Sequence, residues 1–98
     1  RTAPDYRFYL LAGGPPLRPG LVRVDEGGGA IEVEVWSLPT EQVGGFIAGI
    51  PAPLGIGRVR LADGSTAPGF LCEALAVADA RDITDLGSWR ALLAAEAP

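Results

Sequence analysis

Glycine and proline interrupt this chain so often that none of its helices or strands can be long. The 98 residues include 14 glycines and 9 prolines, many of them clustered between short apolar runs. Glycine weakens the interior of a regular element, and proline removes a backbone donor from it. Short strands punctuated by glycine favour a curled sheet or a small β-barrel.

The apolar runs between these breaks predict short strands and helices. The expected strands cover residues 6–11, 21–24, 31–36, 58–61 and 70–74, and the expected helices cover residues 40–49 and the residues that follow Asp85. Strands clustered around one embedded helix indicate an α+β fold with a mostly antiparallel or mixed sheet. A chain of this length amounts to one domain, so residues 1–98 are expected to form a single unit.

The clearest periodicity lies in residues 31–36. Apolar residues alternate there with polar ones, and a period of two predicts a strand with one apolar face. Glu32 and Glu34 lie on its other face, where paired carboxylates more often meet solvent than perform acid–base chemistry. Arg58 and Arg60 have matching spacing on a later strand, which favours cross-strand ion pairs with the two glutamates.

The helical segments carry local signals at their ends and in their interiors. Apolar residues at helical spacing predict an amphipathic helix over residues 40–49, with Thr40 as its N-cap. Gly44 and Gly45 weaken this helix by about 1 kcal/mol each relative to alanine, and close packing on another element would explain them. Asp85 is the expected cap of the final helix, whose apolar residues form one stripe.

Other single residues and segments leave alternatives open. Residues 51–57 contain prolines and predict a shaped loop, and residues 63–65 predict a turn. Cys72 lies in an apolar strand, so a buried structural thiol is favoured over a reactive one. Trp36 lies on the polar face of its predicted strand, so it packs either against the final helix or against a partner protein. Trp89 is expected to be a core or interface anchor.

Composition excludes several classes of function. One cysteine permits no intrachain disulfide, and the absence of histidine removes histidine metal sites, Ser-His triads and histidine general bases. A net charge of −4 argues against nucleic-acid binding. No apolar run approaches the roughly 18 residues of a membrane span, and no signal peptide opens the chain. We therefore expect a cytoplasmic protein without metal or cofactor.

All of the positive charge is carried by arginine. Arg7, Arg18 and Arg23 lie in or beside the first two expected strands. A local group of arginines can hold a small anion on an acidic domain, because guanidinium binds carboxylates in a bidentate way. Scattered surface charge is the favoured alternative when these residues are considered by themselves.

Several motifs together resemble one known family. They are Pro19-Gly20-Leu21-Val22-Arg23-Val24, the segment from Ile31 to Pro39, Ile50-Pro51-Ala52-Pro53-Leu54-Gly55-Ile56-Gly57, Gly69-Phe70-Leu71-Cys72-Glu73, and the closing residues Asp82, Ile83 and Gly87 to Arg90. On these motifs the chain resembles, over nearly its whole length, the C-terminal domain of bacterial allophanate hydrolases. The string from Ile50 to Gly57 is the specific part, because few loops need so many constrained residues in succession.

The resemblance implies a gamma-glutamyl-cyclotransferase-like fold, a small barrel with flanking helices. It also implies a place in urea catabolism beside an N-terminal amidase domain, where this domain takes the amidase product, N-carboxycarbamate, to carbon dioxide and ammonia. Gamma-glutamyl cyclotransferases carry a catalytic glutamate in the region that here reads Ile50 to Ile56. No carboxylate lies there, so cyclotransferase activity is not expected.

The family also has a first strand and loop ahead of Arg1, and that segment holds the histidine proposed as its acid–base group. No residue here matches it, so the chain is expected to lack its opening strand, to be inactive alone and to leave the catalytic residue unknown. What remains is the pocket wall for a small dicarboxylate-like anion. By position the candidates are Tyr9, Arg18, Pro53, Leu54, Gly55, Ile56 and Gly57.

A second hypothesis belongs to a different class of function. The chain is then a non-catalytic assembly domain that holds amidase subunits together, and the protein is a homo-oligomer. Trp36 on a strand face and an incomplete barrel suit this hypothesis, because an open sheet edge invites pairing.

Overall fold

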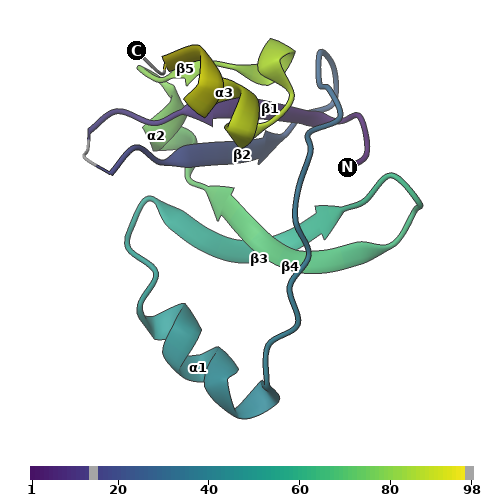
Figure 1. Ribbon diagram of the computed structural model, residues 1–98, viewed down its shortest axis with the longest axis vertical. Helices are drawn as coiled ribbons and strands as arrows, with labels where there is room; N and C mark the ends of the chain where they lie inside the picture. Colours follow the sequence, from purple (N-terminus) through teal and green to yellow (C-terminus); the bar gives the residue numbers. More distant parts are fainter. Residues whose placement is uncertain (14–15, 97–98) are drawn as a thin grey trace.

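The computed structural model describes residues 1–13 and 16–96 and has two antiparallel sheets in two layers (Figure 1). The elements in chain order are β1 (Tyr6–Leu10), β2 (Pro19–Arg23), α1 (Thr40–Ala48), β3 (Leu54–Arg60), β4 (Thr66–Cys72), α2 (Ala74–Val77), β5 (Arg81–Asp82), a 3₁₀ turn (Thr84–Leu86) and α3 (Trp89–Glu96). The first sheet has the order β2-β1-β5, and β3 and β4 form the second. The expected α+β class with antiparallel sheets is confirmed.

The upper sheet forms around β1, whose alternating residues have one buried face. Tyr6 is paired with Arg23 of β2, and Tyr9 is paired with Gly20 of β2 and with Asp82 of β5. Both strands predicted here, over residues 6–11 and 21–24, are confirmed to within about two residues.

The lower sheet is the β3–β4 hairpin. Its turn holds Gly64 at φ +90°, and the Ser65 N–H donates to Asp63 Oδ1 at 2.9 Å, as the predicted turn requires. The predicted loop over residues 51–57 is too long, because β3 begins at Leu54. Residues 54–57 contain no proline and pair with residues 69–72; only the part around the cis Ala52–Pro53 bond is loop.

The core lies between the two sheets and α3. Its buried side chains are Tyr6, Phe8, Leu21, Ile31, Val59, Ile83 and Leu92. Trp89 packs edge-on against Phe8 with ring centroids 6.4 Å apart, so Trp89 is the core anchor that the sequence predicted. Helix α3 is capped by Ser88, whose Oγ accepts the Ala91 N–H at 3.0 Å. The prediction of Asp85 as this cap is wrong, because Asp85 lies in the preceding 3₁₀ turn.

The first residues of the chain join the two sheets. Thr2 is fully buried, its N–H donates to the Ile31 carbonyl at 2.9 Å, and its Oγ1 accepts the Ile31 N–H at 2.9 Å. On the hairpin side, the Ala3 N–H donates to the Arg60 carbonyl at 2.9 Å. The Tyr6 hydroxyl accepts the Arg60 N–H at 2.8 Å. Residues 1–6 therefore hold the hairpin and the segment at Ile31 against the upper sheet.

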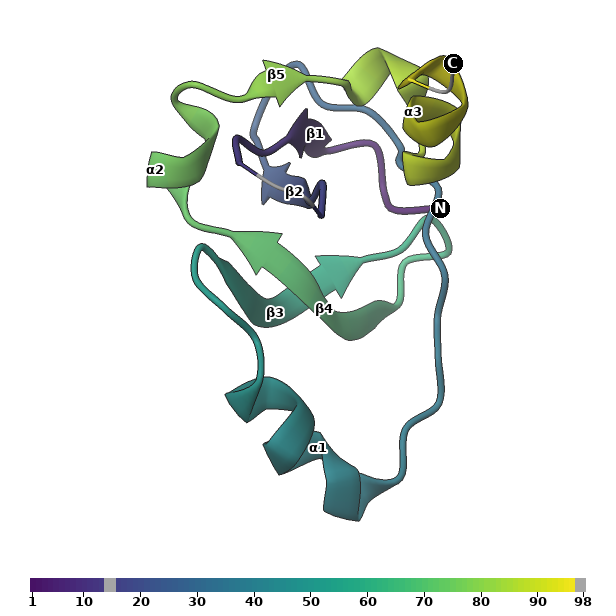
Figure 2. The ribbon, with the colours of Figure 1, turned by 60° about the vertical axis from the view of Figure 1, so that its left-hand side comes forward.

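The predicted strand over residues 31–36 is wrong, and the two sheets do not close into a barrel within the described residues. Residues 31–39 instead form an extended arm, which runs from the upper layer down to α1 (Figure 2). The expected ion pairs are also wrong: Glu34 pairs with Arg90, and Arg60 pairs with Asp5. Alternation gave the segment two faces, but no strand within residues 1–13 and 16–96 lies beside it to complete a ladder.

Helix α1 is confirmed, but its surroundings differ from the prediction. No residue of α1 is buried, its N-cap is Pro39 instead of Thr40, and no side-chain cap bond forms. A Cβ on Gly44 or Gly45 would meet nothing within 4 Å beyond the helix's own backbone. The expectation that close packing explains these glycines is therefore wrong in this chain. Trp36 is 81% exposed and so does not pack against α3.

We predict that Thr2→Val lowers the free energy of unfolding by about 1–3 kcal/mol, because it leaves the buried Ile31 N–H without an acceptor. Urea denaturation followed by tryptophan fluorescence measures the change. Thr2→Ser keeps the hydroxyl and is expected to lose less. Equal losses in both variants, or no loss in the valine variant, would contradict a role for the hydroxyl.

Candidate functional site

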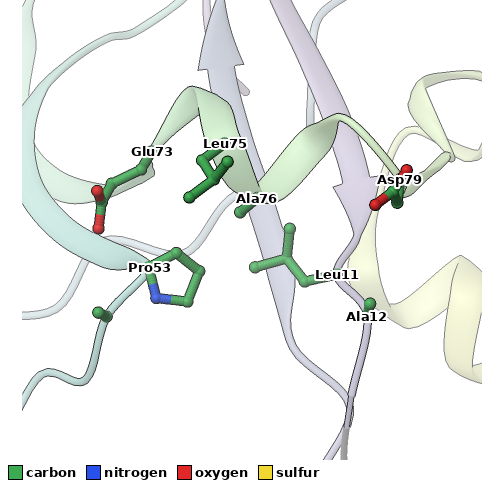
Figure 3. Close-up of a pocket in the computed structure, with 8 residues that line it drawn as sticks. Leu11, Ala12, Pro53, Glu73, Leu75, Ala76 and Asp79 are labelled. Carbon is green, nitrogen blue, oxygen red and sulfur yellow. The ribbon is translucent and has the colours of Figure 1, made fainter.

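A pocket of about 380 Å³ opens where the end of β1, the cis-proline turn and α2 meet (Figure 3). Its described lining consists of Leu11, Ala12, Ala52, Pro53, Glu73, Leu75, Ala76 and Asp79. Three segments distant in sequence therefore contribute to one concave surface at one end of the molecule.

Backbone hydrogen bonds set the shape of this end. The Leu11 N–H donates to the Arg18 carbonyl at 2.9 Å, which closes the loop between β1 and β2. The Glu73 N–H donates to the Pro53 carbonyl at 2.9 Å, which fastens the cis-proline turn to the start of α2. Proline cannot donate, so its carbonyl is the only backbone group that Pro53 offers for this contact.

The pocket has an apolar floor and an acidic rim. Leu11, Pro53 and Ala76 supply the floor, and Glu73 and Asp79 lie at opposite ends of it (Figure 3). Both carboxylates lower the affinity for an anion inside the pocket by Coulomb repulsion. An anion at this end of the molecule therefore needs a cation from outside the described lining.

The predicted site residues are only partly brought together. Pro53 lines the pocket, whereas Leu54, Gly55, Ile56 and Gly57 belong to β3. Tyr9 and Arg18 are half-buried and lie outside the described lining. The loop that ends at Arg18 is nevertheless the loop that begins with Leu11, so Arg18 and Pro53 flank the same end of the fold.

Sequence reasoning missed most of the lining. Leu11 and Glu73 were assigned to the predicted strands over residues 6–11 and 70–74, although Glu73 in fact precedes α2. No element was predicted for Leu75, Ala76 and Asp79. The short run of helix-forming residues from Ala74 to Val77 was the available signal. A single helical turn is too short to show a period, so the pattern alone did not distinguish it.

Most of the arginines are already paired. Arg7, Arg23, Arg60, Arg81 and Arg90 each lie in an ion pair with a carboxylate. The group of Arg7, Arg18 and Arg23 is therefore not one free anion site, because Asp82 and Asp5 occupy two of its members. Among the described residues no ion pair includes Arg1, Arg18 or Arg58, and of these three Arg18 ends the loop that begins at Leu11.

The Arg7–Asp82 ion pair shifts the pKa of both of its members. Partial burial opposes ionisation of Asp82, but hydrogen bonds from Thr84 and from Arg7 outweigh it and hold the pKa of Asp82 below its ordinary value. The hydrogen bond to Asp82 raises the pKa of Arg7. The charge of Arg7 is thus committed to β5 and contributes to the sheet instead of to ligand binding.

Cys72 is half-buried, so it matches the predicted buried structural thiol only in part. Its Sγ lies 3.9 Å from the Leu21 carbonyl oxygen, between β4 and β2, and burial raises the pKa of the thiol. A raised pKa lowers the thiolate fraction at neutral pH, which disfavours nucleophilic chemistry. In the described ranges, no three carboxylate or thiol groups gather to hold a metal ion, and no helix is long and apolar enough to span a bilayer.

We predict that Asp82→Asn lowers the free energy of unfolding at neutral pH by up to about 1 kcal/mol, the usual limit for an exposed ion pair. The asparagine oxygen can still accept from Thr84, so the variant removes mainly the Arg7 pair. A carboxylate with a depressed folded-state pKa stabilises the fold above its unfolded pKa of about 3.9, and this stabilisation is lost as pH falls through the folded value.

The difference in free energy of unfolding between the parent chain and Asp82→Asn should therefore shrink as the pH is lowered below about 4. Urea denaturation at a series of pH values measures it. A difference that stays constant down to pH 2, or widens on acidification, would contradict the account.

The sequence matches a family model described as the allophanate hydrolase C-terminal domain, over residues 1–94. It is 43% identical over 95 residues to the urea amidolyase of Saccharomyces cerevisiae (strain ATCC 204508 / S288c), a match that covers 93% of this chain. The chain spans only 5% of the length of that relative.

Solved structures give the same result. The fold superimposes on Kluyveromyces lactis allophanate hydrolase with a TM-score of 0.90 and 39% identity, covering 96% of this chain and 16% of that one. It superimposes on a uropathogenic E. coli-specific protein with a TM-score of 0.85 and 39% identity, covering 96% of this chain and 72% of that one. The relatives include yeast as well as bacterial proteins, and the wider gamma-glutamyl-cyclotransferase-like kinship stays a prediction.

Proposed function

Because the chain belongs to the family of allophanate hydrolase C-terminal domains, we propose that it serves in urea breakdown as part of a larger enzyme. In that enzyme an amidase domain deaminates allophanate, and this domain takes the product, N-carboxycarbamate, to carbon dioxide and ammonia. The observation that carries the proposal is the match to this family over residues 1–94. The similarity to K. lactis allophanate hydrolase supports it.

The chemistry of the substrate defines what the site must do. N-carboxycarbamate is a dianion with two carboxylates on one nitrogen. Each C–N bond breaks with its electron pair staying on nitrogen, which takes up a proton as carbon dioxide leaves. One dianion and two protons therefore give two molecules of carbon dioxide and one of ammonia. The site needs positive charge for the carboxylates and a proton source for the nitrogen.

This chain can supply the first requirement. Arg18 lies in no ion pair among the described residues, and its backbone closes the loop that begins at Leu11 on the pocket floor. A guanidinium can bind a carboxylate through two parallel hydrogen bonds. Glu73 and Asp79 would repel a dianion from the acidic side of the pocket, so the substrate is placed on the Arg18 side, near Pro53.

The proton source is a separate matter. The chain has no histidine. Cys72 is a poor proton donor, because its pKa is raised and its thiol lies between two strands. We therefore assign these residues to the wall of the site, and the proton to solvent or to a residue of another segment of the larger enzyme.

Malonate tests this proposal, because it has the shape and charge of the substrate and is stable. Titration into the ¹⁵N-labelled chain should shift the amides of Leu11, Ala12, Arg18 and Leu54. Arg18→Gln should weaken malonate binding about tenfold, the usual effect of losing one charge-assisted hydrogen-bonded pair.

Matched variants separate a specific site from general charge effects. Arg58→Gln removes an exposed arginine from β3 and should leave the affinity unchanged, whereas Glu73→Gln should raise it by removing a repulsive charge. Shifts that follow Arg58 as much as Arg18, or no shifts at saturating malonate, would overturn the assignment.

The assembly function remains the second candidate, and exposed apolar surface favours it. Trp36 is 81% exposed and Val35 is 70% exposed on the arm, and Phe46 of α1 is 48% exposed. Exposed apolar groups in this density are typical of surfaces that bind another protein. A chain that ignores malonate and forms a concentration-dependent dimer in sedimentation would favour assembly over catalysis.

A further inference from the structure

The acidic rim of the pocket takes no part in binding the proposed anion. Glu73 and Asp79 repel an anion, and neither residue belongs to an ion pair within residues 1–13 and 16–96. Both residues are exposed, so their charges meet whatever enters the pocket. Two uncompensated negative charges at one cavity favour a cationic occupant by Coulomb attraction.

Helix α2 holds the two carboxylates apart. Glu73 precedes this helix, Asp79 follows it, and Ala78 between them keeps helical backbone angles. At 1.5 Å of rise per residue, the chain advances about 9 Å from Glu73 to Asp79. The two carboxylates lie at opposite ends of the pocket floor (Figure 3). A single metal ion fits this arrangement poorly, because it needs its oxygen ligands within about 2.6 Å.

The surface between the carboxylates is apolar. Leu11 is buried, Pro53 and Ala76 are half-buried, and Leu75 beside them is 86% exposed. Methylene groups placed along this surface remove apolar area from water, which stabilises the bound state. A hydrated inorganic cation gains nothing from such a floor. The cavity of about 380 Å³ also lies in the size range of small-molecule sites.

We propose that this pocket binds a linear aliphatic diamine, with one ammonium group at Glu73 and the other at Asp79. The alkyl chain of the diamine then lies over Leu11, Pro53 and Ala76. Aliphatic amines are protonated at neutral pH, as the side chain of lysine is. A chain of about six methylenes matches the spacing of about 9 Å, because each C–C bond of an extended chain advances it by about 1.3 Å.

The diamine and the proposed substrate use different sides of this end of the molecule. The diamine lies against the acidic rim, whereas the anion is assigned to the Arg18 side, near Pro53. The diamine proposal therefore does not rest on the proposed reaction. One substitution separates the two, because Glu73→Gln should strengthen malonate binding and weaken diamine binding. Opposite responses of one variant cannot come from a general loss of structure.

Three amines test the proposal in titrations of the ¹⁵N-labelled chain at constant ionic strength. Hexamethylenediamine should shift the amides of Ala12, Glu73, Ala76 and Asp79. Hexylamine has the same alkyl chain but one charge, so it should bind about three- to fivefold more weakly, the usual effect of one exposed ion pair. Trimethylenediamine has two charges but cannot span the floor, so it should also bind more weakly than hexamethylenediamine.

Neutral variants of similar size identify the contacts of each ammonium group. Asp79→Asn and Glu73→Gln should each weaken hexamethylenediamine binding about three- to fivefold, which brings its affinity close to that of hexylamine. Glu41→Gln removes an exposed carboxylate from α1 and should leave both affinities unchanged. Amide spectra that are otherwise the same as those of the parent chain show that the variants fold.

Several outcomes would overturn the proposal. Equal binding of hexamethylenediamine and hexylamine would show that the second carboxylate makes no contact. The same shifts with sodium or calcium chloride would show an effect of inorganic cations only. A loss in Glu41→Gln as large as that in Asp79→Asn would show a general charge effect, and an absence of shifts would show no site. Failure of malonate to bind would overturn the proposed reaction but not this inference.

Discussion

The fold depends on hydrogen bonds that residues 1–6 make to both sheets at once. Thr2 binds Ile31, Ala3 binds the Arg60 carbonyl, and the Tyr6 hydroxyl receives the Arg60 N–H. Tyr6 and Thr2 are completely buried, so their polar groups cannot form hydrogen bonds with water. The hydrogen bonds to Ile31 and Arg60 offset the cost of removing these groups from water. Through them the hairpin takes a fixed place below β1, and the cis-proline turn at the start of β3 comes to lie beside the loop after β1.

This placement explains why a strongly acidic domain can be proposed to hold an anion. The carboxylates of Asp5, Glu34, Asp82 and Glu96 occupy most of the arginines, and the pocket itself has an acidic rim. Arg18 is the cation left at the pocket end, and it is held there by the loop closure at Leu11. In this proposal the pocket supplies the concave surface, and Arg18 beside it supplies the positive charge. Substrate binding and the apolar arm then lie on different parts of the molecule and can be altered separately.

The sequence predicted those parts of the fold that local interactions decide. The strands around Phe8 and Leu21, the Asp63 turn and α1 all follow from patterns contained within each segment. The arm was predicted wrongly because alternation specifies the two faces of a strand but not whether a neighbour exists. Gly44 and Gly45 were likewise assigned to a packing contact that no described element makes. Of the wall residues proposed from the resemblance, Pro53 lines the described pocket. Leu11 and Glu73 were not predicted there, because only the tertiary fold brings β1 and α2 together.

Native-state hydrogen exchange tests most directly whether residues 1–6 unite the two sheets. The amide of Arg60 reports on the hairpin, that of Ile31 on the arm, and that of Ile83, which donates to the Phe8 carbonyl at 2.7 Å, on the upper sheet. If the account is right, all three exchange only through global unfolding, with the same free energy and the same dependence on denaturant. Exchange of Arg60 at a much lower free energy than Ile83 would show that the hairpin opens on its own, and would contradict the claim.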